Sequence, residues 1–228
     1  MYRFRNFGVI LKISIFVTGF AGIVAEFVLS TLATYLIGNA IFQWTIVMSL
    51  MLFAMGVGSR ISRFFRFRLL DIFVLTELAL SILCAISAQL AYILAAYTNY
   101  TNFAIYVQAF LIGSLIGLEI PLVIRINEKF EELRVNISTV MEKDYFGALF
   151  GGLVFAFFAL PYLGLTYTPI LLGIINFIVA SLLLWQFFHL IERKIFITGL
   201  YSFVLIFLVL LGVFAKPIIR YGEQRKYR

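Results

Sequence analysis

Four carboxyl groups within or at the edge of apolar segments are the side chains most able to do chemistry in this sequence. Glu26, Glu77 and Glu119 each interrupt a hydrophobic run, and Asp144 stands at the start of another. A carboxylate at bilayer depth costs about 2.5 kcal/mol or more to insert, so such a residue generally faces protein or water. We predict that all four acids are substrate-binding residues, with Glu77, Glu119 and Asp144 in one acidic layer near the cytoplasmic side and Glu26 separate and deeper in the first span.

Each of these acids also has a structural explanation, which stays open at this point. Glu77 and Glu119 could form salt bridges to a nearby arginine, and Glu26 could be a neutral acid hydrogen-bonded to a neighbouring helix. Asp144 stands at a predicted helix N-terminus, where the helix dipole favours an anion. Three further charges border the same layer, and we interpret them as interfacial residues that snorkel or pair: Arg60, Asp71 and Arg125.

The elements that position these residues are predicted to be membrane-spanning helices. The chain has 228 residues, of which 63% are hydrophobic and 13% charged, about half the charge of a soluble domain. Its apolar runs are roughly 20 residues long, as in helices that cross a bilayer, and they lack the alternation of barrel strands. We therefore expect an all-α, polytopic integral membrane helix bundle with about seven transmembrane helices, at residues 9–36, 41–59, 70–96, 102–125, 144–161, 168–189 and 195–215.

The distribution of Lys and Arg predicts the orientation of the bundle. Basic residues gather near the N-terminus, in the loops at residues 60–68 and 125–143, and at Arg193 and Lys194. The loops expected on the other side, including residues 160–167, contain no Lys or Arg. The positive-inside rule then places the N-terminus in the cytoplasm. We expect the membrane itself to be a bacterial or archaeal cytoplasmic membrane.

Two domains are predicted, a transmembrane helical domain at residues 1–215 and a basic C-terminal tail at residues 216–228. The apolar stretch after the basic N-terminus is too long for a signal peptide, so we interpret it as a retained first span. Seven spans would leave the tail outside the cell despite its basic residues, whereas a re-entrant segment would bring it inside. The side of the tail therefore stays open.

Glycines repeat at the spacing that lets helices approach closely in lipid. Two GxxxG pairs lie beside Glu119 and Asp144, and another glycine pair precedes Arg60. We predict that six of these residues form helix-packing seams: Gly56, Gly58, Gly113, Gly117, Gly147 and Gly151.

Other chemistry has no basis in the sequence. One histidine, His189, and one cysteine, Cys84, cannot make a metal or haem site by themselves, so we expect no metal and no cofactor. There is no nucleotide-binding loop and no nucleophile elbow, so we do not expect an enzyme in this chain by itself. The net charge of +7 comes from basic residues between hydrophobic runs, which favours topology over nucleic-acid binding as its explanation.

Several segments together match a known family pattern. The motif "GLEIPL" around Glu119 and the motif "DYFGAL" from Asp144 follow residues 19–63 in order and spacing. In these features nearly the whole chain resembles the membrane-embedded N-terminal domain of transmembrane spermidine synthase-like (polyamine aminopropyltransferase) proteins. In that family a soluble domain follows, which takes decarboxylated S-adenosylmethionine and a polyamine. The resemblance implies that Glu26, Glu119 and Asp144 match recurrent acidic positions, and that the catalytic domain is lacking here.

We therefore expect a non-catalytic membrane module of a spermidine synthase-like system. It would bind or pass a cationic amine, a polyamine, or dock a soluble synthase at the membrane. The expected partners are the lipid bilayer, a polyamine ligand, and a soluble aminopropyltransferase or a larger membrane complex. The alternative is a structural or accessory subunit of a larger membrane protein complex, which docks its partner through the glycine seams and the basic tail.

Overall fold

The computed structural model describes residues 2–98, 100–128 and 132–226, and within them the side chains of 8–98, 100–128, 132–221 and 224. All regular structure in this part of the chain is helical, so the all-α prediction is confirmed. Residues 227–228 of the predicted tail lie outside the description. The elements are α1 (Tyr2–Ile37), α2 (Ala40–Ser62), α3 (Leu69–Tyr97), α4 (Thr101–Asn127), α5 (Leu133–Val154), η1 (Phe155–Leu163), α6 (Gly164–Phe187), η2 (Phe188–Leu190) and α7 (Lys194–Lys226).

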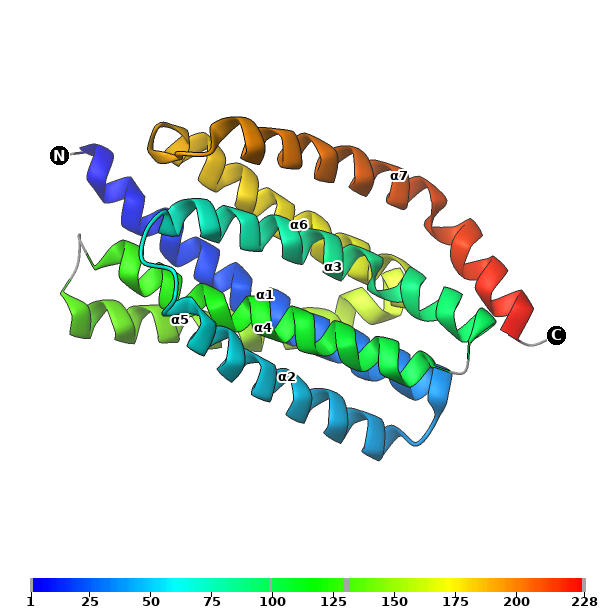
Figure 1. Cartoon of the computed structure of the whole chain (residues 1–228). Helices are drawn as coiled ribbons and strands as arrows, with labels where there is room; N and C mark the ends of the chain where they lie inside the picture. Colours follow the sequence, from blue (N-terminus) through cyan, green and yellow to red (C-terminus); the bar gives the residue numbers. More distant parts are fainter. Residues whose placement is uncertain (1, 99, 129–131, 227–228) are drawn as a thin grey trace.

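Six helical segments of the described chain are long and apolar enough to cross a membrane. The fifth and sixth predicted spans fall together in one segment of 58 residues, Leu133–Leu190. A straight helix of that length would extend roughly 87 Å, far beyond a bilayer core. Figure 1 shows instead that α5 runs to one end of the bundle and that α6 returns from it. Six segments do not by themselves establish the predicted number of seven spans.

The predicted loop at residues 160–167 is wrong, because helical structure continues through it. The π-helical segment η1 follows α5 directly, and α6 begins at Gly164 without an intervening loop. Gly164 reverses the chain with φ of 63°, a left-handed conformation that glycine adopts without a steric penalty. A single glycine thus replaces the loop that the sequence led us to expect.

The prediction that Asp144 stands at a helix N-terminus is wrong, since α5 begins at Leu133 and Asp144 lies in the middle of it. Asn136 fixes this earlier start, because its side-chain amide donates to the Ile124 carbonyl at 2.8 Å. Its Oδ1 also accepts a hydrogen bond from the Asn127 amide at 2.9 Å. These bonds join α5 to the end of α4, so much of the predicted 125–143 loop is helix.

Glycines bring α2 and α4 into close contact. A Cβ added at Gly58 would overlap the Ser114 carbonyl, and one added at Gly117 would overlap the backbone of Met55. Gly113 likewise lies against the Met51 carbonyl. The two helices can approach this closely only because these positions have no side chain.

The helices α1 and α5 meet in the same way. Gly147 lies against the Phe16 carbonyl and Gly151 against the Phe20 carbonyl, while Gly19 of α1 lies against the backbone of Asp144. The α1–α5 seam therefore places Asp144 directly on α1.

Gly56 of α2, by contrast, has no atom within 4 Å of a built Cβ, so its neighbourhood is open space.

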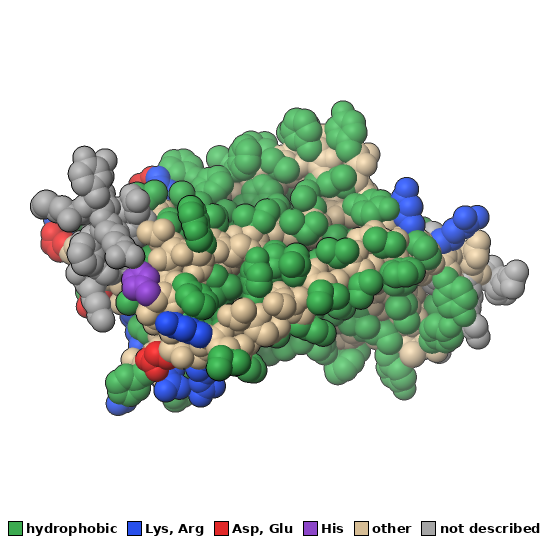
Figure 2. Space-filling view, turned by 90° about the horizontal axis from the view of Figure 1, so that it is seen from above, with side chains coloured by type: hydrophobic (Ala, Val, Ile, Leu, Met, Phe, Trp, Pro, Cys, Tyr) green, Lys and Arg blue, Asp and Glu red, His purple; other side chains and the backbone are tan. Residues whose placement is uncertain are grey.

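The surface of the bundle is apolar along most of its length. Figure 2 shows hydrophobic side chains over the middle and charged side chains at the two ends. Large exposed hydrophobic residues such as Leu52, Phe103 and Ile206 would be costly in water, yet they are ordinary in lipid. Six apolar helices with this surface are compatible with a membrane protein.

Candidate functional site

Glu77 of α3 and Glu119 of α4 come together inside the bundle. Their side chains are 1% and 0% exposed, and they lie close enough for their charges to interact. Among the described residues, Oε1 of Glu77 and both carboxyl oxygens of Glu119 have no hydrogen-bond partner. Buried polar atoms are nearly always hydrogen-bonded, so this pair can accept hydrogen bonds from a ligand or from water.

Asp144 and Thr18 complete the surroundings of Glu119. Asp144 is half-buried on α5, and its charge acts on Glu119. The Thr18 hydroxyl lies beside Glu119, but it donates to the Ser14 carbonyl at 3.1 Å and leaves the carboxylate unsatisfied. Three of the predicted acids thus form one cluster, which we call the acidic cluster: Glu77, Glu119 and Asp144.

Glu26 stands apart from the acidic cluster. It is buried on α1, seven residues beyond Gly19, which touches Asp144. At about 1.5 Å per residue, this separation is roughly 10 Å along the helix. The structure therefore brings together three of the four predicted acids and leaves the fourth deeper in the bundle.

Sequence reasoning missed two neighbours of the cluster. Cys84 on α3 lies within electrostatic range of both Glu77 and Glu119. Asn176 of α6 donates its side-chain amide to the Cys84 sulfur at 3.8 Å, while its Oδ1 has no partner among the described residues. Asn176 could have been found by the same criterion as the glutamates, because it is a polar residue in an apolar run.

Arg125 and Asp71, two of the charges predicted to border the acidic layer, each bind a connection between helices. Arg125 donates to the carbonyl of Ser62 at 2.9 Å and also to that of Phe65, and so closes the connection between α2 and α3. No described Lys or Arg makes an ion pair with Glu77 or Glu119. The structural alternative for these two acids, a salt bridge to a neighbouring arginine, is therefore not seen in the described part.

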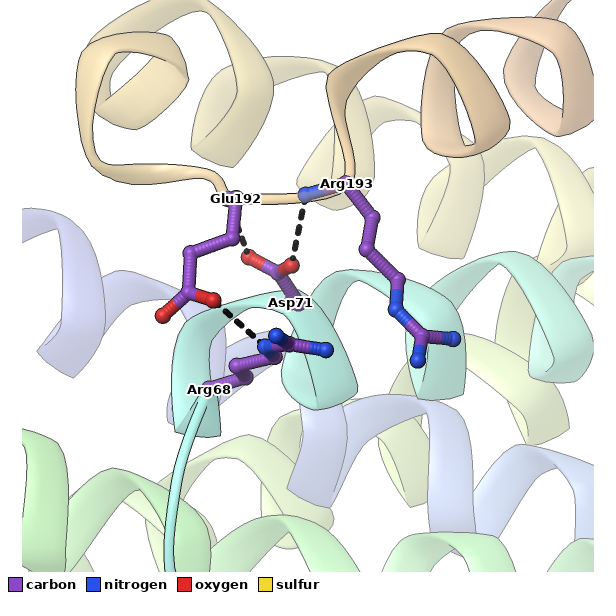
Figure 3. Close-up of polar contacts among 4 residues, drawn as sticks. All are labelled: Arg68, Asp71, Glu192 and Arg193. Carbon is purple, nitrogen blue, oxygen red and sulfur yellow. Dashed lines mark hydrogen bonds and ion pairs between the residues drawn. The ribbon is translucent and has the colours of Figure 1, made fainter.

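Asp71 is as buried as the glutamates but is fully engaged, as Figure 3 shows. Its two carboxyl oxygens accept hydrogen bonds from the backbone N–H groups of Glu192 and Arg193, at 3.2 and 3.0 Å. Arg68, on the turn before α3, pairs with the Glu192 side chain. These contacts tie the α6–α7 connection to the start of α3, which makes Asp71 a structural residue. Arg60 is exposed.

The described residues contain no group of three or more His, Cys, Asp or Glu side chains arranged to hold a metal ion.

Comparison with known proteins gives similar chains in several bacteria. A protein of Aquifex aeolicus is 48% identical over 218 residues, which is 95% of this chain and 43% of the relative. A protein of Leptospira interrogans is 34% identical over 95% of this chain and 44% of its own, and one of Streptomyces coelicolor is 31% identical over 89% and 39%. These relatives are all named polyamine aminopropyltransferase.

The match to the polyamine aminopropyltransferases covers nearly all of this chain but only part of each relative. This chain spans less than half the length of the curated relatives it matches, although nearly all of its own length is covered. No family model matches the chain. No solved structure matches it either.

Proposed function

We propose that the chain is the membrane module of a polyamine aminopropyltransferase-like system and that its acidic cluster binds a cationic amine. The observation that carries this proposal is the pair of buried carboxyl groups, Glu77 and Glu119, with unsatisfied oxygens and no described cationic partner. The names of the relatives supply the class of ligand, because a polyamine is a hydrocarbon chain with several amino groups that are protonated to ammonium at neutral pH.

The physical argument is one of charge and hydrogen bonding together. A carboxylate buried without a partner loses its hydration and gains nothing in return. An ammonium group supplies both a positive charge and N–H donors to such a site, so binding a cationic amine would neutralise the pair. Asp144, half-buried at the edge of the cluster, gives an approaching cation a first carboxylate to meet.

The membrane topology that fits this role has seven crossings, with α5 and α6 each crossing once. The reversal at Gly164 and the paths of the two helices in Figure 1 support this number. The basic residues of the 60–68 connection and of Arg193 and Lys194 support a cytoplasmic location for that end. The predicted divisions, residues 1–215 in the membrane and 216–228 as a basic tail, belong to the same proposal.

A soluble aminopropyltransferase is the partner that we propose for this module. The relatives extend well beyond the matched region, and their names describe aminopropyl transfer in connection with polyamines. The module would supply that chemistry with amine at the membrane and need not catalyse a step itself.

Equilibrium binding of labelled spermidine to the full chain, purified in detergent, tests the site. We expect saturable binding that weakens about tenfold or more in Glu119→Gln and in Glu77→Gln, because each change removes a carboxyl group that can pair with the ammonium group of the ligand. Glu192→Gln is the matched control, since Glu192 is an exposed carboxylate that pairs with Arg68. Equal binding by all four proteins would exclude the acidic cluster and favour the alternative of an accessory subunit held in a larger complex.

A further inference from the structure

A cavity of about 570 Å³ lies between the last turns of α7 and the first turn of α6. Five residues line it: Thr166, Lys216, Pro217, Ile219 and Arg220. It is separate from the acidic cluster, none of whose members lines it. Its lining combines two cations and a hydroxyl with two apolar side chains.

The cavity owes its shape to the local sequence of α7. Pro217 lies inside this helix, where it removes a backbone donor and crowds the preceding turn. Figure 1 shows α7 bending in its last third, as expected around such a proline. The bend carries Lys216 and Arg220 along the end of the bundle near Thr166, at the start of the 24-residue helix α6. The N-terminus of a helix carries partial positive charge, which adds to that of the two side chains.

The positive charge of the cavity is not neutralised by described residues. Lys216 places its ammonium group 5.6 Å from the centre of the Tyr167 ring, and neither Lys216 nor Arg220 forms an ion pair with a described carboxylate. In the face seen in Figure 2, the acidic side chains lie at the opposite end, and Lys and Arg are the charged residues visible here. The opposite end differs, since Arg68 there is paired with Glu192.

The cavity also lies at the depth of lipid headgroups. The 21 residues from 195 to 215 carry no charge, and at about 1.5 Å per residue they extend roughly 31 Å, the thickness of a bilayer core. Lys194 and Lys216 bracket this stretch, so Lys216 stands where the hydrocarbon ends. Pro217 and Ile219 give the cavity an apolar wall beside its two cations.

We propose that this cavity binds the phosphate group of an anionic ligand, and that an anionic phospholipid headgroup is its source. Lys216 and Arg220 contact the phosphate oxygens, the Thr166 hydroxyl donates to them, and the apolar wall meets the lipid backbone. Arginine and lysine are the usual protein partners of phosphate, and basic residues at the membrane surface attract anionic lipids. This site is independent of the proposed amine site, since none of its lining residues belongs to the acidic cluster.

The test uses the full chain purified in detergent and titrated with fluorescent phosphatidylglycerol, with phosphatidylcholine as the neutral comparison. We expect tighter binding of phosphatidylglycerol, and a loss of about fivefold for each charge removed in Lys216→Gln, Arg220→Gln and the double variant. Lys194→Gln is the matched control, because Lys194 also lies over an aromatic ring, that of Phe188, and lines a surface pocket with no second cation. This control should bind phosphatidylglycerol as the wild type does.

A second arm uses inorganic phosphate as a competitor. If the lipid is the source, millimolar phosphate should leave phosphatidylglycerol bound to the wild type. Displacement of phosphatidylglycerol from the wild type by millimolar phosphate would identify free phosphate as the source and would keep the phosphate site. Equal binding of the two lipids, or equal binding by the wild type and the double variant, would overturn the proposal. Both lipid measurements are binding measurements on intact protein, and an unchanged unfolding temperature of the variants shows that they remain folded.

Discussion

Glu119 and Asp71 show how differently two buried carboxyl groups are treated in one bundle. Asp71 is 3% exposed and accepts two backbone hydrogen bonds, whereas Glu119 is 0% exposed and accepts none from the described residues. Burial of a polar group without a partner is unfavourable, while burial with good partners is not. Asp71 therefore contributes to stability, and Glu119 is retained at the expense of stability.

Replacing Glu119 by leucine should stabilise the protein while abolishing amine binding. Leucine removes the unsatisfied oxygens and fills most of the same space, and such exchanges of buried charge are often neutral or stabilising. We expect the unfolding temperature of Glu119→Leu in detergent to rise by about 2–4 °C. Spermidine should raise the unfolding temperature of the wild type and leave that of the variant unchanged. A variant that unfolds earlier than the wild type would contradict this assignment.

Replacing Asp71 by alanine should have the opposite effect. The change leaves the N–H groups of Glu192 and Arg193 without their acceptor, and hydrogen bonds to a charged group contribute about 1.5–3 kcal/mol each. Chemical unfolding in detergent should show a lower free energy of unfolding by that order. Arg68→Gln, which removes only the exposed pair with Glu192, should cost about 1 kcal/mol or less. Comparable losses in the two variants would show that Asp71 does not hold the connection.

At the scale of elements, apolar runs predicted most helices and missed two features. The prediction at residues 41–59 lies within α2, and that at 70–96 lies within α3, because apolar length alone defines these spans. The start of α5 was missed because residues 133–143 are polar enough to read as a loop, and Asn136 holds them through tertiary hydrogen bonds. The turn at Gly164 was missed because the backbone stays helical on both sides of it.

The acidic cluster was predictable in part, for a related reason. A carboxylate in an apolar run is visible in one dimension, so Glu77, Glu119 and Asp144 could be named, and the helix geometry that places them at one level follows from the alternation of the spans. Asn176 and Cys84 depend on how α6 packs against α3, which no local pattern encodes. The satisfied state of Asp71 likewise depends on a connection more than a hundred residues away.

The glycine seam between α2 and α4 gives a test at the scale of elements. Gly117→Ala places a methyl group on the backbone of Met55, and we expect a loss of about 1–3 kcal/mol from overpacking. Gly56→Ala is the matched control, because Gly56 is on α2 at a position that open space surrounds. Alanine favours a helix over glycine by up to about 1 kcal/mol, so the control should be neutral or slightly stabilising. A gain in the free energy of unfolding for Gly117→Ala, together with a loss for Gly56→Ala, would show that Gly117 does not have this packing role.

At the scale of the whole molecule, the two ends of the chain lie at opposite ends of the bundle (Figure 1). An odd number of crossings would produce this arrangement, with the basic connections on one side of the membrane. The proposed topology requires α5 and α6 to be separate crossings. The side of the membrane on which the turn before Gly164 lies decides whether they are.

Cysteine labelling in vesicles measures that topology directly. In a Cys84→Ala background, we expect Asn39→Cys and Tyr162→Cys to react with an impermeant maleimide added to right-side-out vesicles, whose outer face is that of the cell. Both positions are at the end of the bundle away from the basic connections. Arg66→Cys and Arg193→Cys should react only in inverted vesicles. Tyr162 is the decisive position, because its side chain is 80% exposed at the α5–α6 reversal. Labelling of Tyr162→Cys from the same side as Arg66→Cys would reduce the number of crossings.

The link between Asp71 and the α6–α7 connection also has a kinetic consequence. Amide hydrogens in a surface connection normally exchange with solvent deuterium almost at once, whereas those held by a buried carboxylate exchange only when the site opens. The N–H groups of Glu192 and Arg193 should therefore be protected far more strongly than their position in the sequence suggests. Opening that connection would release the start of α7 from α3, so the exchange rate of two amides reports how often this end of the last helix separates from the bundle.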